Sequence, residues 1–194
     1  MSAVPPSKGS QRNGAPPANF LANNARHAQA RVPSPWRRVA IFYAWAMLMA
    51  YFFANAEIQI EGGAGWATSL PTWRIEKHWL LDLFWGGRAM TGYHAWVFSF
   101  MLLVFFMPLA FNGRFRWSDF VLAVAGVAVF WVVEDFLWFV INPAFGLARF
   151  TPELVTWHPR WLAGLPIDYW WGVLAALGLA WLHVKLVRRE AGRR

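Results

Sequence analysis

Two adjacent carboxylic acids, Glu134 and Asp135, lie inside an otherwise apolar run of the sequence, residues 120–141. A helix through this run would place Glu134 roughly 10 Å from its near end, at about 1.5 Å of rise per residue. A charged side chain at such a depth in a membrane costs about 2.5–3.5 kcal/mol on insertion scales, so it usually faces the interior of a helix bundle and has a partner. Three partners suit a carboxylate there: a metal ion, a basic side chain or a shared proton.

Three further residues of metal-ligating type are expected at the same end of the bundle. His94 precedes the second apolar run, Asp168 begins the fourth, and His158 lies in the loop before the fourth. Imidazole and carboxylate groups are common ligands of Zn, Mn and Fe, so the sequence predicts a divalent-metal site. The expected ligands are His94, Glu134, Asp135, His158 and Asp168, with Glu134 and Asp135 as the catalytic candidates. No His-Glu-x-x-His or Glu-x-x-His signature accompanies them, so this prediction depends on the convergence of the helix ends, where Asn55 would add a polar group.

Simpler interpretations of these carboxylates stay open. Glu134 and Asp135 would instead form ion pairs with arginines of the two long loops, which follow the first and third apolar runs. These arginines are Arg88, Arg149 and Arg160. They would alternatively carry protons or ions in coupled transport, since intramembrane carboxylates also mark proton relays. Asp168 follows Pro166 in the first turn of a predicted helix, where the helix dipole favours a carboxylate without any ligand.

The elements that would position these residues are four apolar helices. Hydrophobic residues make up 58% of the chain and charged residues 14%, whereas about a quarter would be charged in a soluble domain. Each of four apolar runs approaches the ~20 residues needed to cross a bilayer, and backbone groups in lipid must be satisfied within a helix. The runs are residues 39–56, 95–111, 120–141 and 167–184. We therefore expect an all-α membrane protein with a four-helix transmembrane domain over residues 36–187.

The loop between the first and second apolar runs, called the first outer loop below, contains a shorter amphipathic segment, residues 71–85. Pro71 suits the first position of a helix, and Gly86-Gly87 suits its stop. The segment therefore predicts an interfacial helix, in keeping with a tryptophan-rich chain of 15 Trp, because Trp prefers the headgroup level. His78 and Asp82 are four residues apart and would share one face of this helix. The simpler interpretation of this pair is a polar, solvent-exposed helix face.

The distribution of basic residues predicts the orientation. Residues 1–35 are rich in Pro, Gly and Ser and are expected to form a disordered basic tail, and residues 188–194 form a second basic tail. Of the 18 Lys and Arg, thirteen fall in or next to the two tails and in the short turn after the second run, and five fall in the outer loops. The positive-inside rule then places both termini in the cytoplasm, and we expect a bacterial inner membrane. The net charge of +8 follows from this topology and from contact with anionic lipid, so no nucleic-acid partner is expected.

Composition excludes several kinds of chemistry. The chain has no cysteine, which rules out disulfides, thiolate metal ligands and a cysteine nucleophile. It also has no glycine-rich phosphate loop and no Gly-x-Ser-x-Gly elbow. The leading hypothesis is a small integral membrane protein with a buried His/carboxylate site that opens to the outer (periplasmic) side, binds a metal, and acts on or binds a lipid-like ligand. The alternatives are a non-catalytic accessory subunit or assembly factor, which would bind other membrane subunits, and a proton-coupled transporter.

Overall fold

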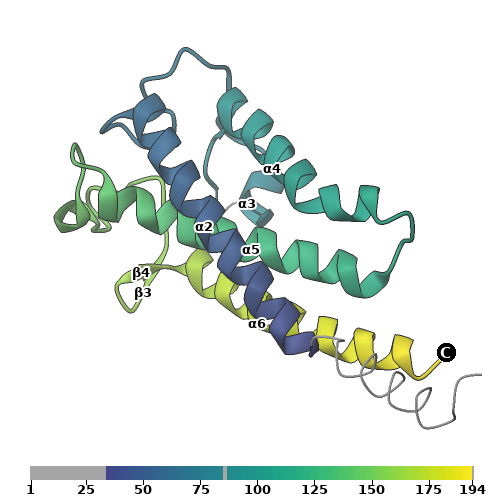
Figure 1. Cartoon of the computed structure of the whole chain (residues 1–194). Helices are drawn as coiled ribbons and strands as arrows, with labels where there is room; N and C mark the ends of the chain where they lie inside the picture. The colour runs from purple at the N-terminus through teal and green to yellow at the C-terminus, as the bar shows by residue number, and fades with distance from the viewer. Residues whose placement is uncertain (1–33, 85–86, 194) are drawn as a thin grey trace, which may run out of the picture. The chain divides into compact units, whose positions relative to one another are not determined.

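Four long helices dominate the computed structural model, which describes residues 34–84 and 87–193 (Figure 1). They are α2 (Pro35–Glu61), α4 (Gly92–Phe111), α5 (Trp117–Ile141) and α6 (Ile167–Ala191). Each is long and apolar enough to cross a membrane, which confirms the predicted four-helix transmembrane fold. The expected disordered tail falls almost entirely on residues 1–33, which lie outside the described residues. All the elements named here belong to one compact unit, Pro35–Arg194.

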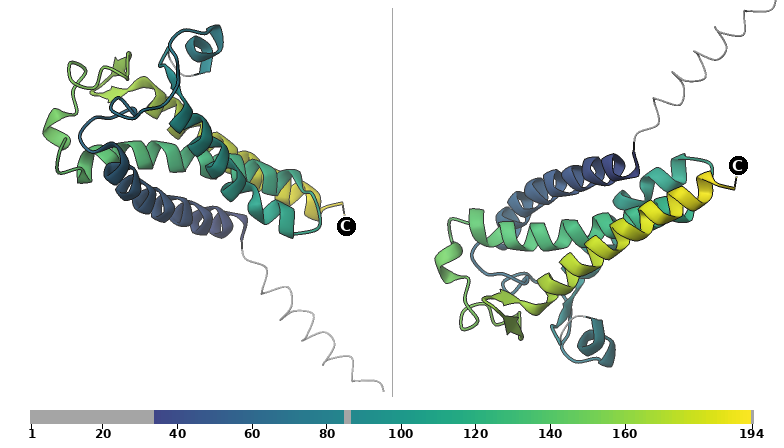
Figure 2. Two further views of the ribbon diagram at one scale, coloured as in Figure 1. Left: turned by 90° about the horizontal axis from the view of Figure 1, so that it is seen from above. Right: turned by 90° about the horizontal axis from the view of Figure 1, so that it is seen from below.

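Helix α5 is the centre of the bundle, because α2, α4 and α6 all pack against it (Figure 2). The face of α2 that meets its neighbours is lined with small residues, Ala46, Ala50 and Ala54, all fully buried. Small side chains let two helix backbones approach closely, which is a common way for helices to pack within a bilayer. Large side chains such as Phe130 of α5 fill the adjacent space. Many large apolar residues on the opposite helix faces stay exposed, as suits contact with lipid tails.

Helix α2 extends further than its apolar run indicates. The predicted span ended at residue 56, but the helix continues to Glu61, and both Glu57 and Glu61 are buried. These two residues continue the buried stripe of Ala46, Ala50 and Ala54, at three- and four-residue spacing. They therefore face the bundle instead of the outer loop to which the sequence pattern assigned them.

The first outer loop differs from the expected helix over residues 71–85. Within the described residues 71–84, the helical part is Trp79–Phe84 (α3), and Pro71 lies well before it. Residues Arg74–Ile75 (β1) instead pair antiparallel with Met90–Thr91 (β2), in the register Arg74 to Thr91. The pairing satisfies backbone groups that an interfacial helix would have satisfied internally. It also fixes the residue immediately before α4, which bears on the site.

The second outer loop, between α5 and α6, folds back over the end of the bundle. It contains a short 3-10 turn, η1 (Leu147–Arg149), and a hairpin of β3 (Trp161–Leu162) and β4 (Leu165–Pro166). Both hairpin turn residues, Ala163 and Gly164, have positive φ angles of 50° and 79°, as a two-residue hairpin turn requires. The hairpin leads directly into α6 and so sets the position of the first residues of that helix.

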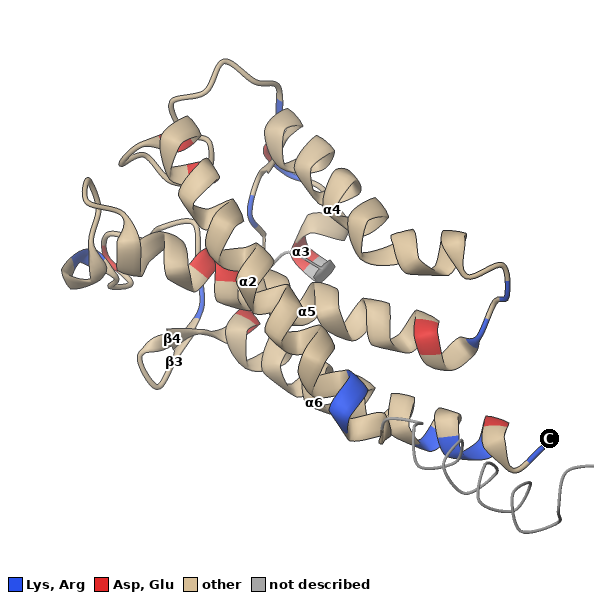
Figure 3. Cartoon of the chain, in the orientation of Figure 1, with Lys and Arg blue, Asp and Glu red and all other residues tan. Residues whose placement is uncertain are grey.

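Charges are divided between the two ends of the bundle (Figure 3). At the end that holds both the start of α2 and the end of α6, Arg38 pairs with Asp119 at 3.0 Å and Arg116 pairs with Glu190 at 2.5 Å. At the other end, carboxylates from α2, α5 and α6 gather inside the bundle. The functional candidates all lie at this second end.

Candidate functional site

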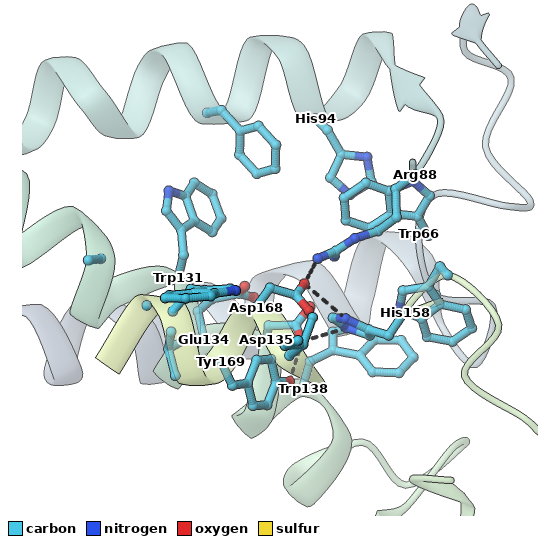
Figure 4. A pocket seen from close by; sticks show the side chains of 18 of the residues that line it. Trp66, Arg88, His94, Trp131, Glu134, Asp135, Trp138, His158, Asp168 and Tyr169 are labelled. Atoms are coloured by element: carbon cyan, nitrogen blue, oxygen red, sulfur yellow. Dashed lines mark hydrogen bonds and ion pairs between the residues drawn. The ribbon is translucent and has the colours of Figure 1, made fainter. Parts of the chain in front are cut away.

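All five predicted metal ligands line one cavity, which has a volume of about 740 Å³. It is formed by α4, α5 and α6 together with the end of α2 and parts of both outer loops (Figure 4). Its ionisable lining residues are Glu57, Glu61, Asp82, Arg88, His94, Glu134, Asp135, His158, Arg160, Asp168 and Tyr169. Tryptophans make up much of the remaining lining: Trp66, Trp131, Trp138, Trp157 and Trp171. The cavity is therefore polar at the end where the two long loops lie and aromatic along its walls.

The first cluster in this cavity joins α2 to α4. Glu57, Glu61 and His94 are all buried, and each offers a ligand atom within 4.8 Å of the others. Two atoms that ligate one zinc ion, each at about 2.0–2.2 Å, lie at most about 4.4 Å apart. These three side chains could therefore converge on one metal ion with small adjustments.

His94 is held by the residue that precedes α4. Thr91 is the N-cap of this helix: its Oγ1 accepts a hydrogen bond from the backbone N–H of His94 at 3.2 Å. The same Oγ1 lies 2.7 Å from Nδ1 of the imidazole, which leaves Nε2 as the nitrogen for a ligand. The ring also stacks on Trp66, with ring centroids 3.9 Å apart. The imidazole orientation is thus fixed from two sides.

Glu61 is anchored by the loop that follows α2. Its Oε1 accepts a hydrogen bond from the backbone N–H of Ala67 at 2.5 Å, and the carbonyl of Ala67 accepts one from Arg74. Trp66 and Ala67 both have positive φ angles, 58° and 53°. This conformation is uncommon for residues other than glycine, and here it turns the Ala67 amide toward Glu61 and the Trp66 ring toward His94.

The second cluster surrounds His158, which the second outer loop carries into the bundle. Its Nε2 lies 3.1 Å from Oδ2 of Asp135, and its Nδ1 lies 3.2 Å from Oδ2 of Asp168. Asp135 also accepts a hydrogen bond from the Tyr169 hydroxyl. A neutral imidazole can donate from one nitrogen only, so a second proton must reside on the ring or on one of the two carboxyl groups. The cluster can therefore store and relay a proton.

Arg88 closes the second cluster at its outer edge. Its guanidinium forms an ion pair with Asp168 and lies 4.9 Å from the centre of the Trp66 ring. Burial lowers the pKa of Arg88 from its ordinary value, while the Asp135 carboxylate opposes that shift. Because Trp66 also stacks on His94, this tryptophan joins the two clusters.

Glu134 lies between the clusters, and its carboxyl group neighbours that of Glu57. Among the described residues, its Oε1 atom has no hydrogen-bond partner, although it is fully buried. The same holds for Nε1 of Trp138, which lies one helical turn further along α5. Buried polar atoms are usually paired, so these two atoms mark a place where a ligand or solvent would be bound.

The structure divides the predicted ligand set into two groups. His158 lies with Asp135 and Asp168, whereas His94 lies with Glu57 and Glu61, which the sequence pattern had placed in a loop. The sequence signal that Glu57 and Glu61 would be buried was their spacing, which continues the stripe of buried alanines on α2. Thr91 and Trp66 had no such signal, since nothing in their neighbourhood distinguishes them from other Thr and Trp residues.

Of the other expected contributors, Arg88 belongs to the second cluster, whereas Asn55, Arg149 and His78 lie outside both clusters. Asn55 is exposed, and its amide donates to the Tyr51 carbonyl of the preceding turn. Of the arginines considered as partners, Arg88 pairs with Asp168, whereas the Arg149 guanidinium contacts the Ala144 carbonyl. His78 lies before α3 and is exposed, so the expected helical face of His78 and Asp82 does not form as predicted.

No protein-family model, curated protein or solved structure matches this chain. The argument for its function therefore depends on the cavity and its residues. What the structure establishes is a membrane-spanning helical protein with a buried Glu57, Glu61 and His94 group that could bind a metal ion.

Proposed function

We propose that this membrane protein binds a divalent metal ion at Glu57, Glu61 and His94 and uses it to act on a lipid-like ligand. The observation that carries the proposal is the convergence of these three side chains, within 4.8 Å, in the cavity that also holds the His158 cluster. Zn, Mn and Fe are the candidate ions, since all three accept mixed imidazole and carboxylate ligands.

The charges of the first cluster favour a cation. Two buried carboxylates together balance the charge of a divalent ion, and without a cation or protons they would repel each other in a medium of low dielectric constant. Three protein ligands leave a coordination position open, as in catalytic zinc sites. The contact between His94 Nδ1 and Thr91 resembles the outer-shell hydrogen bonds that orient metal-bound histidines.

The chain supplies acid and base groups beside this cluster. A bound metal ion would supply Lewis acidity, which lowers the pKa of a water molecule that it binds. Glu134 is next to Glu57 and has an unpaired oxygen, so it is the candidate proton acceptor. Asp135 holds His158 in place, and the pair would return a proton to a leaving group.

Support for a lipid-like ligand comes from the cavity walls. They consist largely of aromatic and aliphatic side chains on helices that cross the membrane. We further propose that the cavity opens on the periplasmic side of a bacterial inner membrane, which the distribution of Lys and Arg supports.

Elemental analysis of the protein purified in detergent tests this proposal. We expect about one equivalent of Zn, Mn or Fe per chain in the wild type, and loss of that metal in Glu57→Gln and His94→Gln. Glu76→Gln, an exposed carboxylate of the first outer loop, is the matched control and should keep the metal. Thermal unfolding of each variant shows whether it is folded.

The contrary result is a folded wild type that contains no metal and is not stabilised by added Zn, Mn or Fe. If other membrane proteins then co-purify in fixed ratio, the chain is an accessory subunit and the metal proposal is wrong.

A further inference from the structure

Two residues that line the cavity from the same side of α5 each have an unpaired polar atom. Glu134 and Trp138 are 3% and 4% exposed, respectively, and both line the cavity. They are four residues apart, so their side chains are neighbours on the helix surface, about 5–6 Å apart at Cβ. Glu134 Oε1 and Trp138 Nε1 both have no partner among the described residues.

The chemistry of these two atoms is complementary. The indole nitrogen can only donate a hydrogen bond, and a carboxyl oxygen that carries no proton can only accept one. A ligand group that satisfies both must accept from Trp138 and donate to Glu134. A hydroxyl group does both, an ether oxygen can only accept, and an ammonium group can only donate.

From this point toward the middle of the bundle, the lining of the cavity is apolar. Its floor is formed by α5, at Val127 and Ala128, and its sides by α4 and α6. On the sides, Leu102 is 44% exposed and Trp171 is 66% exposed, although both line the cavity. Both residues belong to helices apolar enough to cross a membrane, so the part of the cavity wall that α4 and α6 contribute would lie beside the lipid.

We propose that the ligand is an amphiphilic alcohol whose hydroxyl group binds between Glu134 and Trp138 and whose apolar body lies between α4 and α6. This inference rests on the proposed lipid-like ligand, but it does not depend on the metal ion. A volume of about 740 Å³ lies within the usual range for sites that enclose a small organic molecule.

Photolabelling with a diazirine-bearing hexadecanol tests the hydroxyl directly. The purified protein is labelled in the presence of one of three competitors of equal chain length: hexadecan-1-ol, 1-methoxyhexadecane or hexadecylamine. We expect the alcohol to compete at about tenfold lower concentration than the ether, because the ether leaves Glu134 without a donor. We also expect it to compete better than the amine, which leaves the Trp138 indole without an acceptor. Labelled peptides should come from α4, α5 and α6.

Two variants and a matched control connect this preference to the two atoms. Trp138→Phe and Glu134→Leu should each reduce the advantage of the alcohol over the ether to within about twofold. Trp131→Phe also changes an indole of α5 that lines the cavity, two turns from Trp138, and should keep the advantage. Thermal unfolding identifies variants that are folded. If Glu134→Leu is not, Trp138→Phe carries the test, and Glu134→Gln, which retains an acceptor oxygen, should keep the advantage.

The outcomes separate this inference from the proposed function. If the ether or the amine competes as well as the alcohol, the hydroxyl inference is wrong, and water or a cation occupies the position instead. If no long-chain probe labels the cavity, the lipid-like ligand of the proposed function is also wrong. Labelling with the expected preference by a wild type that contains no metal as purified and is not stabilised by added Zn, Mn or Fe would support the alcohol and contradict only the metal.

Discussion

Nε2 of His158 lies 3.1 Å from Oδ2 of Asp135, and this contact joins the second outer loop to the centre of the bundle. The imidazole is almost completely buried, with its side chain 1% exposed. Since its Nδ1 lies near Asp168 of α6, the same ring also connects α5 to α6. Loop, core helix and last helix are therefore held together by one side chain.

Removal of either partner of this contact should destabilise the protein. We expect Asp135→Ala to lower the free energy of unfolding by roughly 3 kcal/mol, because it leaves the buried imidazole of His158 without its partner at Nε2. His158→Ala should also be destabilising, because it removes one partner from both Asp135 and Asp168. Glu76→Ala, which changes an exposed carboxylate, should stay within about 0.5 kcal/mol of the wild type. Denaturant unfolding in mixed micelles measures these differences. Equal stability of all three variants would contradict a structural role for the contact.

The hydrogen bond between Thr91 and His94 should tune the metal site. Thr91→Val removes the hydroxyl that lies 2.7 Å from Nδ1 of His94, so we expect metal affinity to fall by about 10- to 100-fold. Thr91→Ser keeps the hydroxyl and should bind metal within about threefold of the wild type. Competition with a calibrated chelator measures the affinities. If valine and serine variants bind equally well, Thr91 acts only as the helix cap, whose loss costs about 1 kcal/mol of stability.

Two glycines of α6 provide a matched test of helix packing. A Cβ atom at Gly172 would lie 2.3 Å from Cγ2 of Val132 on α5, whereas a Cβ atom at Gly178 would meet nothing within 4 Å. We expect Gly172→Ala to destabilise the protein by about 1–3 kcal/mol through overpacking. Gly178→Ala should stabilise it by up to about 1 kcal/mol through helix propensity. Thermal unfolding compares the two, and a reversed order would mean that α5 and α6 do not pack as described.

The four spans could be predicted from the sequence because each depends on a local property, the length of an apolar run. The meeting of carboxylates and histidines at one end also followed from the directions of the helices. The extent of α2 did not follow, since Glu57 and Glu61 interrupt the apolar run although they continue its buried face. A scale that scores hydropathy alone cannot distinguish an acidic residue that is buried from one that ends a span.

The assignment of each histidine to its cluster of carboxylates depends on long-range packing. His94 and His158 both lie at the outer end, but β1–β2 pairing and the Thr91 cap direct His94 toward α2. The β3–β4 hairpin brings Asp168 and Tyr169 into the neighbourhood of His158. These arrangements require strand pairings of two residues each and positive φ angles at Trp66, Ala67 and Ala163, for which single-residue propensities give no signal.

The orientation of the bundle can be tested because the chain has no cysteine. Thirteen Lys and Arg fall on the side of the termini and five on the side of the two long loops, so we expect both termini in the cytoplasm. Glu153→Cys, exposed in the second outer loop, should then react in intact cells with a maleimide that does not cross the membrane. Ala191→Cys at the end of α6 and Asn112→Cys after α4, both exposed, should react only after the cells are lysed. Because the predicted side of the cavity depends on this orientation, the reverse pattern would place the cavity, and therefore its ligand, on the cytoplasmic side.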